Sequence, residues 1–427
     1  MNVAEKAEWT VFTFIAAHNN LQAFGEQSLR QISDVGSTQK VVLGAFLDTG
    51  PGAGLYVMGI DTPGLAESQQ LLGDYDSGEP AGVVAAALWL FEKYPANRYG
   101  LVLWSHGTGW EPAEIEEVAR QARLTAPADG GEGRRRAVAP GRQVLFRSTL
   151  RAMLEPESEA RRAILFDDGS GHSLDTLELA GAISQISQQI KQPLDLLGMD
   201  ACLMANLEVA CQLHGSAKYL VASEELVPAH SWPYLEIYRA LRDTPEMLAA
   251  DFARLIVREY VKFYTDHPPG GGDVTAVALD VERVDELTTA ADQLAGALID
   301  NIGTDAETLA QAQIDTRATE TRKDTRKPSK FDFHLWDLGS LARRLAAGGV
   351  PAVRACATSL LERMKNGNGA VLAEGHVGTW FDGIGGLTIY LPQPPGGASE
   401  HYAPLRFATE TRWPALMGAY RNAFPPG

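Results

Sequence analysis

A cysteine and a histidine each follow a buried-strand pattern, and together they could perform nucleophilic catalysis. Cys202 comes after the apolar run from Leu194 to Met199, and from Leu203 onward the apolar residues take helical spacing. This pattern predicts a strand, a tight turn and a helix that starts near Cys202. Ligands bind at the carboxyl ends of strands in open α/β sheets, and a helix amino terminus favours a thiolate. Cys202 is therefore a candidate nucleophile, although free cysteines are more often small buried hydrophobes.

The second residue is His106, which directly follows the apolar run from Leu101 to Trp104 and precedes Gly107. If the two strands are neighbours in a parallel sheet, His106 and Cys202 leave the sheet at the same edge. A histidine in that place can take the proton of the thiol, and a glycine lets the backbone approach the reacting carbonyl closely. The two strand ends therefore predict a cysteine–histidine dyad.

Strands and helices alternate on both sides of these residues. Helical spacing occurs at 21–32, 83–94 and 174–190, and strand patterns occur at 10–16, 40–47, 164–166, 219–222 and 274–279. Such alternation predicts an α/β fold with a mainly parallel central sheet and helices on both faces. The polar run 304–330 is expected to be loop-rich. A break at the Pro- and Gly-rich stretch 267–272 separates a predicted catalytic domain, 1–268, from a smaller C-terminal α+β region, 269–427, that completes it or packs on it.

The motifs around the dyad resemble those of the clostripain family of cysteine peptidases, which are relatives of caspases and gingipains. The resemblance is carried by His106-Gly107, by Asp200-Ala201-Cys202-Leu203-Met204-Ala205, by the stretch from Ala222-Ser223-Glu224-Glu225 to Trp232-Pro233-Tyr234, and by Gly386–Pro392. It implies a caspase-like three-layer fold and an endopeptidase that cuts after basic residues. It also implies that the backbone N–H groups of Gly107 and Cys202 hold the oxyanion.

Specificity for a basic residue requires an acid beside the nucleophile, because a buried carboxylate can form charge-assisted contacts with a guanidinium. Asp200 stands two residues before Cys202, where the resemblance implies the pocket acid, and Glu224 and Glu225 are further candidates for substrate binding. Asp200 could instead cap the following helix. The choice between arginine and lysine stays open, because His230 and its neighbours stand where relatives carry a second pocket acid.

The balance of charge limits the partners. The chain has 427 residues with 37 Lys and Arg against 54 Asp and Glu, a formal net charge of −17. This charge argues against nucleic acid or an anionic membrane as the main partner and suits basic protein or peptide substrates.

The three cysteines show neither a disulfide framework nor metal-ligand spacing. With no signal-peptide pattern and no apolar stretch long enough to span a bilayer, the chain is expected in the cytoplasm, unless a leader was removed.

No cofactor is required by the dyad chemistry, but calcium is used by some members of the family. Asp167, Asp168, Glu224 and Glu225 could supply the oxygen ligands that calcium prefers, although their spacing is not that of a recognisable calcium loop.

The stretch 124–162 differs from the rest of this acidic chain. A Gly-rich segment is followed by basic residues with no acid among them, which are Arg134, Arg135, Arg136, Arg142, Arg147 and Arg151. Exposed Gly-rich tips are common sites of proteolytic cleavage, so this stretch is a candidate activation loop and the chain a candidate zymogen. The cut could be made by the enzyme itself or by an upstream protease. A solvated basic loop is the competing interpretation.

Three other functions were weighed against the peptidase. An α/β-hydrolase would need a Gly-x-Ser-x-Gly elbow, which the stretches around Ser105 and Ser170 do not provide. A catalytically silent caspase-like protein that binds or scaffolds partners remains the main alternative. A dyad whose main product is a new amide bond also remains open.

Overall fold

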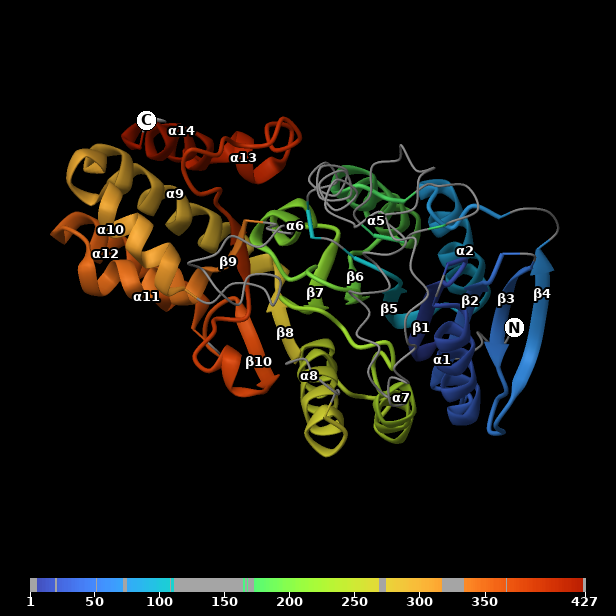
Figure 1. Ribbon diagram of the computed structural model, residues 1–427. Helices are drawn as coiled ribbons and strands as arrows, with labels where there is room; N and C mark the ends of the chain where they lie inside the picture. The colour runs from blue at the N-terminus through green and yellow to red at the C-terminus, as the bar shows by residue number, and fades with distance from the viewer. Residues whose placement is uncertain are drawn as a thin grey trace, which may run out of the picture.

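The computed structural model describes residues 6–19, 21–50, 52–71, 75–107, 109–110, 164–165, 167, 173–268, 274–316, 334–365 and 367–424. One nine-stranded sheet runs through the molecule in the order β10-β8-β7-β6-β5-β1-β2-β3-β4 (Figure 1). Its strands are β1 (Ala7–Ala16), β2 (Val41–Asp48), β3 (Ala53–Met58), β4 (Leu65–Leu71), β5 (Ala96–Trp104), β6 (Leu194–Asp200), β7 (Ala217–Ala222), β8 (Val274–Asp280) and β10 (Val371–Val377).

The centre of this sheet is parallel. β1 pairs in parallel with β2 and β5, β5 with β6, and β6 with β7. Every residue of β2 and of β6 is buried, as expected for strands that are covered on both faces. The strands β3, β4, β8 and β10 join at the two ends in antiparallel pairs. The predicted α/β fold with a mainly parallel sheet is therefore confirmed.

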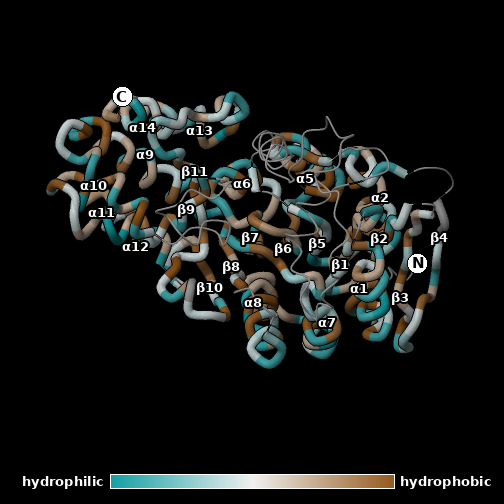
Figure 2. Tube along the Cα trace, in the orientation of Figure 1, coloured by the Kyte–Doolittle hydropathy of each residue, from teal (hydrophilic) through white to brown (hydrophobic). Residues whose placement is uncertain are grey.

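Helices cover both faces of the sheet (Figure 1). On one face lie α1 (Gln22–Val35), α7 (Tyr234–Asp243) and α8 (Ala249–Asp266), and on the other lie α2 (Pro80–Lys93), α5 (Thr176–Ile190) and α6 (Leu207–Gln212). Hydrophilic and hydrophobic segments alternate along α1, α7 and α8 (Figure 2), which is typical of helices with one face on a sheet and one in water. These are the three layers that the sequence predicts.

The sheet continues beyond the predicted domain boundary at 268, because β8 pairs with β7 and β10 pairs with β8. The boundary itself stays a prediction. The remaining C-terminal elements form the layer at the left of Figure 1. They are η1 (Val281–Arg283), α9 (Val284–Asp300), α10 (Ile302–Asp315), β9 (Leu335–Asp337), α11 (Leu338–Gly348), α12 (Pro351–Met364), η3 (Thr379–Phe381), β11 (Thr388–Tyr390), α13 (Arg406–Glu410) and α14 (Trp413–Ala423), with β9 and β11 pairing in a second, two-stranded sheet.

The helix expected to start beside Cys202 is displaced. Leu203 has a φ of 64°, in the left-handed region, so the chain turns there instead of continuing into a helix. Helix α6 begins only at Leu207, where the side chain of Asn206 accepts a hydrogen bond from the backbone N–H of Val209 and caps it. The prediction that a helix amino terminus lies at Cys202 is therefore wrong.

Two other local predictions fail. The run 304–330 contains helix α10, whose Ala306, Leu309 and Ala312 are buried at helical spacing among polar residues; residues 317–333 lie outside the described part. The strand expected at 164–166 is reduced to isolated bridges that Ile164 makes with Gly107 and Leu174. Among the residues that the structure describes, no helix is long and apolar enough to cross a membrane.

Candidate active site

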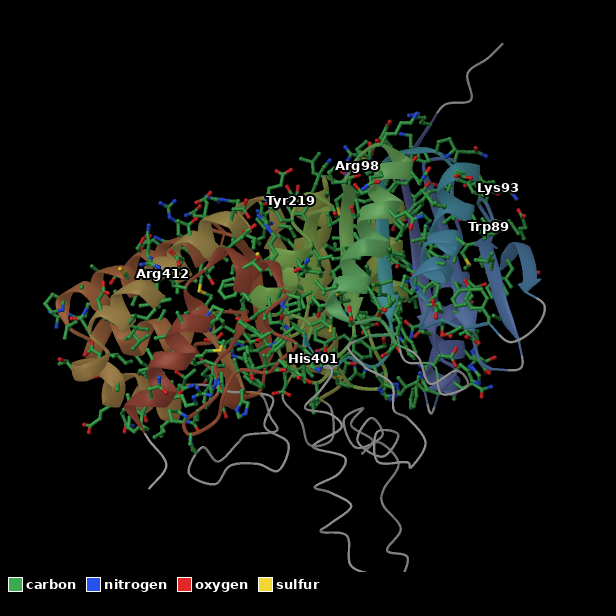
Figure 3. All side chains as sticks on the ribbon, turned by 90° about the horizontal axis from the view of Figure 1, so that it is seen from above. Trp89, Lys93, Arg98, Tyr219, His401 and Arg412 are labelled. Atoms are coloured by element: carbon green, nitrogen blue, oxygen red, sulfur yellow. The ribbon has the colours of Figure 1, made fainter. Side chains whose placement is uncertain are left out.

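The register of β5 and β6 places the two predicted catalytic residues at one edge of the sheet. Trp104 is paired with Asp200 in this parallel ladder, so His106 and Cys202 each follow two residues later. The N–H of Ser105 donates to the carbonyl of Asp200 at 3.4 Å, which extends the pairing by one residue. In Figure 3, Arg98 near the start of β5 and Tyr219 in β7 lie at the amino-terminal side of the sheet, and His401 lies toward the opposite side. His106 and Cys202 are 1% and 2% exposed.

Gly107 lies directly against the backbone of Cys202. A Cβ atom at Gly107 would be 2.5 Å from the carbonyl oxygen of Cys202 and 2.9 Å from the Cβ of Ala201. Only a glycine leaves room for this approach. The two residues whose N–H groups are the predicted oxyanion donors are therefore neighbours in space.

The Gly107→Ala chain should lose activity because the added methyl group has to push the backbone of Cys202 away. A displacement of about 1 Å near the reacting groups can cost about 100-fold in rate, so kcat/KM should fall by at least that factor. The matched control is Gly181→Ala, on the exposed side of α5, where a Cβ atom meets nothing within 4 Å. That control should keep the parent's kcat/KM and unfold slightly later, because alanine favours a helix. Parent activity in a folded Gly107→Ala chain would contradict the close approach.

The segment that follows β7 covers the candidate nucleophile. The carbonyls of Ser223 and Glu225 accept hydrogen bonds from the N–H groups of Ala205 and Leu203, at 2.9 and 3.3 Å. The N–H of Val227 donates to the Sγ atom of Cys202 at 3.3 Å. This segment therefore fixes the turn around Cys202 and lies over its sulfur atom.

The thiol of Cys202 is protonated in this arrangement. The pKa of Cys202 is raised to about 12, mainly by burial and in smaller part by the charges of Glu225 and Asp200, while the Val227 N–H lowers it. A thiolate is the reactive form of cysteine, so a buried thiol with this pKa has low reactivity. The described conformation is thus one in which the candidate nucleophile is covered and unreactive.

Asp200 is held at the end of β6 by three donors. The hydroxyls of Ser231 and Tyr234 and the N–H of Trp232 all donate to its Oδ2, the last two at 2.8 and 3.1 Å. Its Oδ1 is buried and has no hydrogen-bond partner in the part of the chain that the structure describes. Burial raises the pKa of Asp200 to about 6, although these donors lower it. The interpretation that Asp200 caps the next helix is wrong, because Asn206 does so.

The two glutamates after β7 have different surroundings. Glu224 is buried beside Asp337 of the C-terminal region, and its pKa is raised well above the ordinary value by burial and by that neighbouring carboxylate. Glu225 accepts a hydrogen bond from the N–H of Leu226 at 2.9 Å, and its charge acts on Cys202. Of the two, Glu225 is the one whose charge contributes to the pKa of the nucleophile.

Ser231 and Tyr234 were missed as site residues by the sequence-based predictions. They lie 31 and 34 positions beyond Asp200, and their hydroxyls reach it only through the fold. The stretch Trp232-Pro233-Tyr234 was singled out by resemblance alone, and that motif was the available signal.

The acids considered for calcium are not brought to one place. Asp167 lies beside His18 and Asp48 at the ends of β1 and β2, whereas Glu224 and Glu225 follow β7. From β7 to β1 is three strand spacings, roughly 14 Å, so these acids cannot share one ion. Asp168 and the candidate cleavage residues Arg134, Arg135, Arg136, Arg142, Arg147 and Arg151 lie outside the described residues.

Comparison with known proteins agrees with this arrangement. The model of the clostripain family matches residues 148–419, a span that contains Cys202 but not His106.

Two solved structures share the fold over nearly their whole length. A secreted C11 cysteine protease from Bacteroides thetaiotaomicron, in complex with an irreversible peptide inhibitor, has a TM-score of 0.61 and 17% identity, covering 96% of this chain and 99% of that one. An inactive zymogen C11 protease from Parabacteroides distasonis has a TM-score of 0.61 and 19% identity, covering 95% and 99%. No curated protein matches the chain. Because the family model matches well over half of the residues, the chain belongs to the clostripain family of cysteine peptidases.

Proposed function

We propose that this peptidase is an endopeptidase that cleaves after basic residues, arginine above all, with His106 and Cys202 as its dyad. Membership of the family makes peptides or proteins its substrates. The single observation that carries the specificity is the buried Oδ1 of Asp200, two residues before Cys202, which has no hydrogen-bond partner among the described residues. A guanidinium could donate hydrogen bonds to this oxygen and neutralise the negative charge of the buried carboxylate.

The chemistry follows from the two strand ends. The thiolate of Cys202 attacks the carbonyl carbon of the substrate, and His106 protonates the departing amine. The N–H groups of Gly107 and Cys202 stabilise the negative charge on the oxygen of the tetrahedral intermediate. Water, activated by His106, then releases the acyl group from the sulfur. No step requires a metal ion.

We also propose that the chain is made as a zymogen and activated by cleavage within 124–162. The covered thiol supports this proposal, because the segment from Ser223 to Trp232 contacts both Cys202 and Asp200. A substrate can reach these two residues only if that segment moves. The zymogen described for Parabacteroides distasonis has a similar fold and supports the proposal as an analogy.

The experiment that tests the specificity compares fluorogenic peptides that end in Arg, Lys, Asp or Ala. The chain cleaved within 124–162 should hydrolyse the Arg peptide fastest, with Lys second, and should leave the Asp peptide intact. Each peptide is measured with calcium and with a chelator, which tests the calcium requirement at the same time. Equal rates on Arg and Ala would contradict a pocket acid at Asp200. No hydrolysis of any peptide by the cleaved chain would favour the silent binding protein instead. A cytoplasmic location stays a prediction.

A further inference from the structure

A second group of side chains converges at the same edge of the sheet. His18 follows β1, Asp48 ends β2, and Asp167 lies between them and Ser77. One ligand atom from each of His18, Asp48 and Asp167 lies within 4.8 Å of the others. Strand β5, which leads to His106, separates β1 from β6, so this group lies on the other side of β5 from Cys202.

Asp48 gives the strongest indication that this group binds a cation. Its side chain is 0% exposed, and its Oδ1 accepts a hydrogen bond from the N–H of Gly50 at 3.0 Å. Its Oδ2 has no hydrogen-bond partner among the described residues. The pKa of Asp48 is raised to about 6, mainly by burial and in smaller part by the carboxylate of Asp167, while the Gly50 N–H, His18 and Ser77 lower it. A buried carboxylate with an unsatisfied oxygen and a second carboxylate nearby is costly unless a cation neutralises it.

His18 and Asp167 approach each other without forming a hydrogen bond. The Nδ1 of His18 is 2.9 Å from the Oδ1 of Asp167, yet this nitrogen has no partner with hydrogen-bond geometry among the described residues. The other oxygen of Asp167 is held by Ser77, whose N–H and hydroxyl donate to it at 3.1 and 3.4 Å. Two ligands of a tetrahedral zinc ion, each about 2.1 Å from it, lie about 3.4 Å apart, so these two atoms would separate by about 0.5 Å when zinc binds.

The backbone holds the imidazole in this orientation. Gly50 has a φ of 94°, and a Cβ atom there would be 2.6 Å from the Nε2 of His18. The ring therefore lies against Gly50, and its Nδ1 is on the side of Asp167. The side chain of His18 is 30% exposed, so one edge of the group borders solvent.

We propose that His18, Asp48 and Asp167 bind one divalent transition-metal ion, with zinc as the best fit. One imidazole nitrogen and two carboxylate oxygens match the ligands that zinc takes in proteins, and water would complete its coordination. Calcium prefers six to eight oxygen ligands, so this set suits it poorly. The ion would fasten Asp167 to the ends of β1 and β2, close to Ile164, which bridges to Gly107. This proposal does not depend on the specificity proposed above.

The test uses the full chain carrying Cys202→Ala, so that zinc cannot bind the catalytic thiol and the chain does not cut itself. After removal of metal with a chelator and dialysis, zinc is titrated by calorimetry, and bound zinc is counted by elemental analysis. We expect one tight equivalent per chain, and weaker binding of calcium. Asp48→Asn and His18→Gln should each weaken zinc binding by at least about tenfold. The control Asp61→Asn removes an exposed charge outside the group and should bind zinc like the parent.

Thermal unfolding separates a metal ligand from a purely structural residue. Zinc should raise the unfolding temperature of the parent and of Asp61→Asn, but not that of Asp48→Asn. In chelator, Asp48→Asn should unfold no earlier than the parent, because it removes a buried charge whose Oδ2 has no hydrogen-bond partner among the described residues. Equal destabilisation of Asp48→Asn with and without zinc would overturn the proposal. Parent-like zinc affinity in either variant would also overturn it. If Asp48→Asn does not fold, the zinc affinity of His18→Gln decides between the outcomes, because His18 is partly exposed.

Discussion

The Cys202→Ala chain should hydrolyse an arginine peptide at least about 10⁴-fold more slowly than the parent, because no other group can form the acyl intermediate. The substitution removes one buried sulfur atom and the hydrogen bond from the Val227 N–H, so the fold should persist. The measurement is kcat/KM for both proteins after the same cleavage within 124–162, together with their unfolding temperatures. Cys211→Ala, which changes the buried cysteine of α6, is the matched control and should retain activity.

The same variant shows how activation begins. If the enzyme cuts itself, purified Cys202→Ala protein should remain one intact chain while the parent is cleaved. A Cys202→Ala chain that is still cut within 124–162 would show that another protease can make the cut. In the intact chain, alkylation of Cys202 should be slow at neutral pH, because its pKa is raised to about 12 and its sulfur atom is covered. Full activity in an uncut chain whose arginines at 134–151 are all replaced would refute activation by cleavage there.

The placement of His106 and Cys202 at one edge of the sheet could be predicted from the sequence because it depends on local patterns. The apolar runs before His106 and Cys202 form β5 and β6, and residues that follow adjacent parallel strands must emerge at one edge. The start of the next helix was harder to predict. Leu203, Leu207 and Ala210 keep helical spacing although the chain turns at Leu203, and apolar spacing cannot reveal a left-handed residue.

Contacts between distant segments could not be predicted in this way. The family resemblance implies Asp200 as the pocket acid, but its three donors come from the segment that begins α7 and could not be predicted. His18, Asp48 and Asp167 come from separate parts of the chain, and none of them is spaced like a metal motif. The spacing of residues in the sequence predicts which side chains are neighbours on one helix or strand. These groups instead form where several strands end together.

The Asp200→Asn chain should lose about 10²- to 10³-fold in kcat/KM for an arginine peptide, because removing one member of a buried charge pair costs about 2–5 kcal/mol. Hydrolysis of an alanine peptide should change far less, since alanine makes no use of the charge. Asp195→Asn is the matched control. Asp195 is buried on the same strand and binds Lys218 at 2.8 Å and the N–H of Tyr99 at 2.9 Å, but it lies at the amino-terminal end of β6, away from the site. This control should unfold earlier and keep its preference for arginine.

Stability and pH dependence distinguish a pocket acid from a structural one. The pKa of Asp200 is raised from 3.8 to about 6, so this group favours the folded state at acid pH and loses that contribution as the pH rises from about 4 through 6. At pH 8 the carboxylate is a net cost to folding, and Asp200→Asn should unfold no earlier than the parent. In the parent, the ratio of arginine to alanine hydrolysis should fall with falling pH as Asp200 becomes protonated in the cleaved chain, because a protonated Asp200 no longer attracts the guanidinium. In Asp200→Asn that ratio should be low and independent of pH; an arginine preference that survives the substitution would assign the pocket acid to another residue, with Glu225 the first to test.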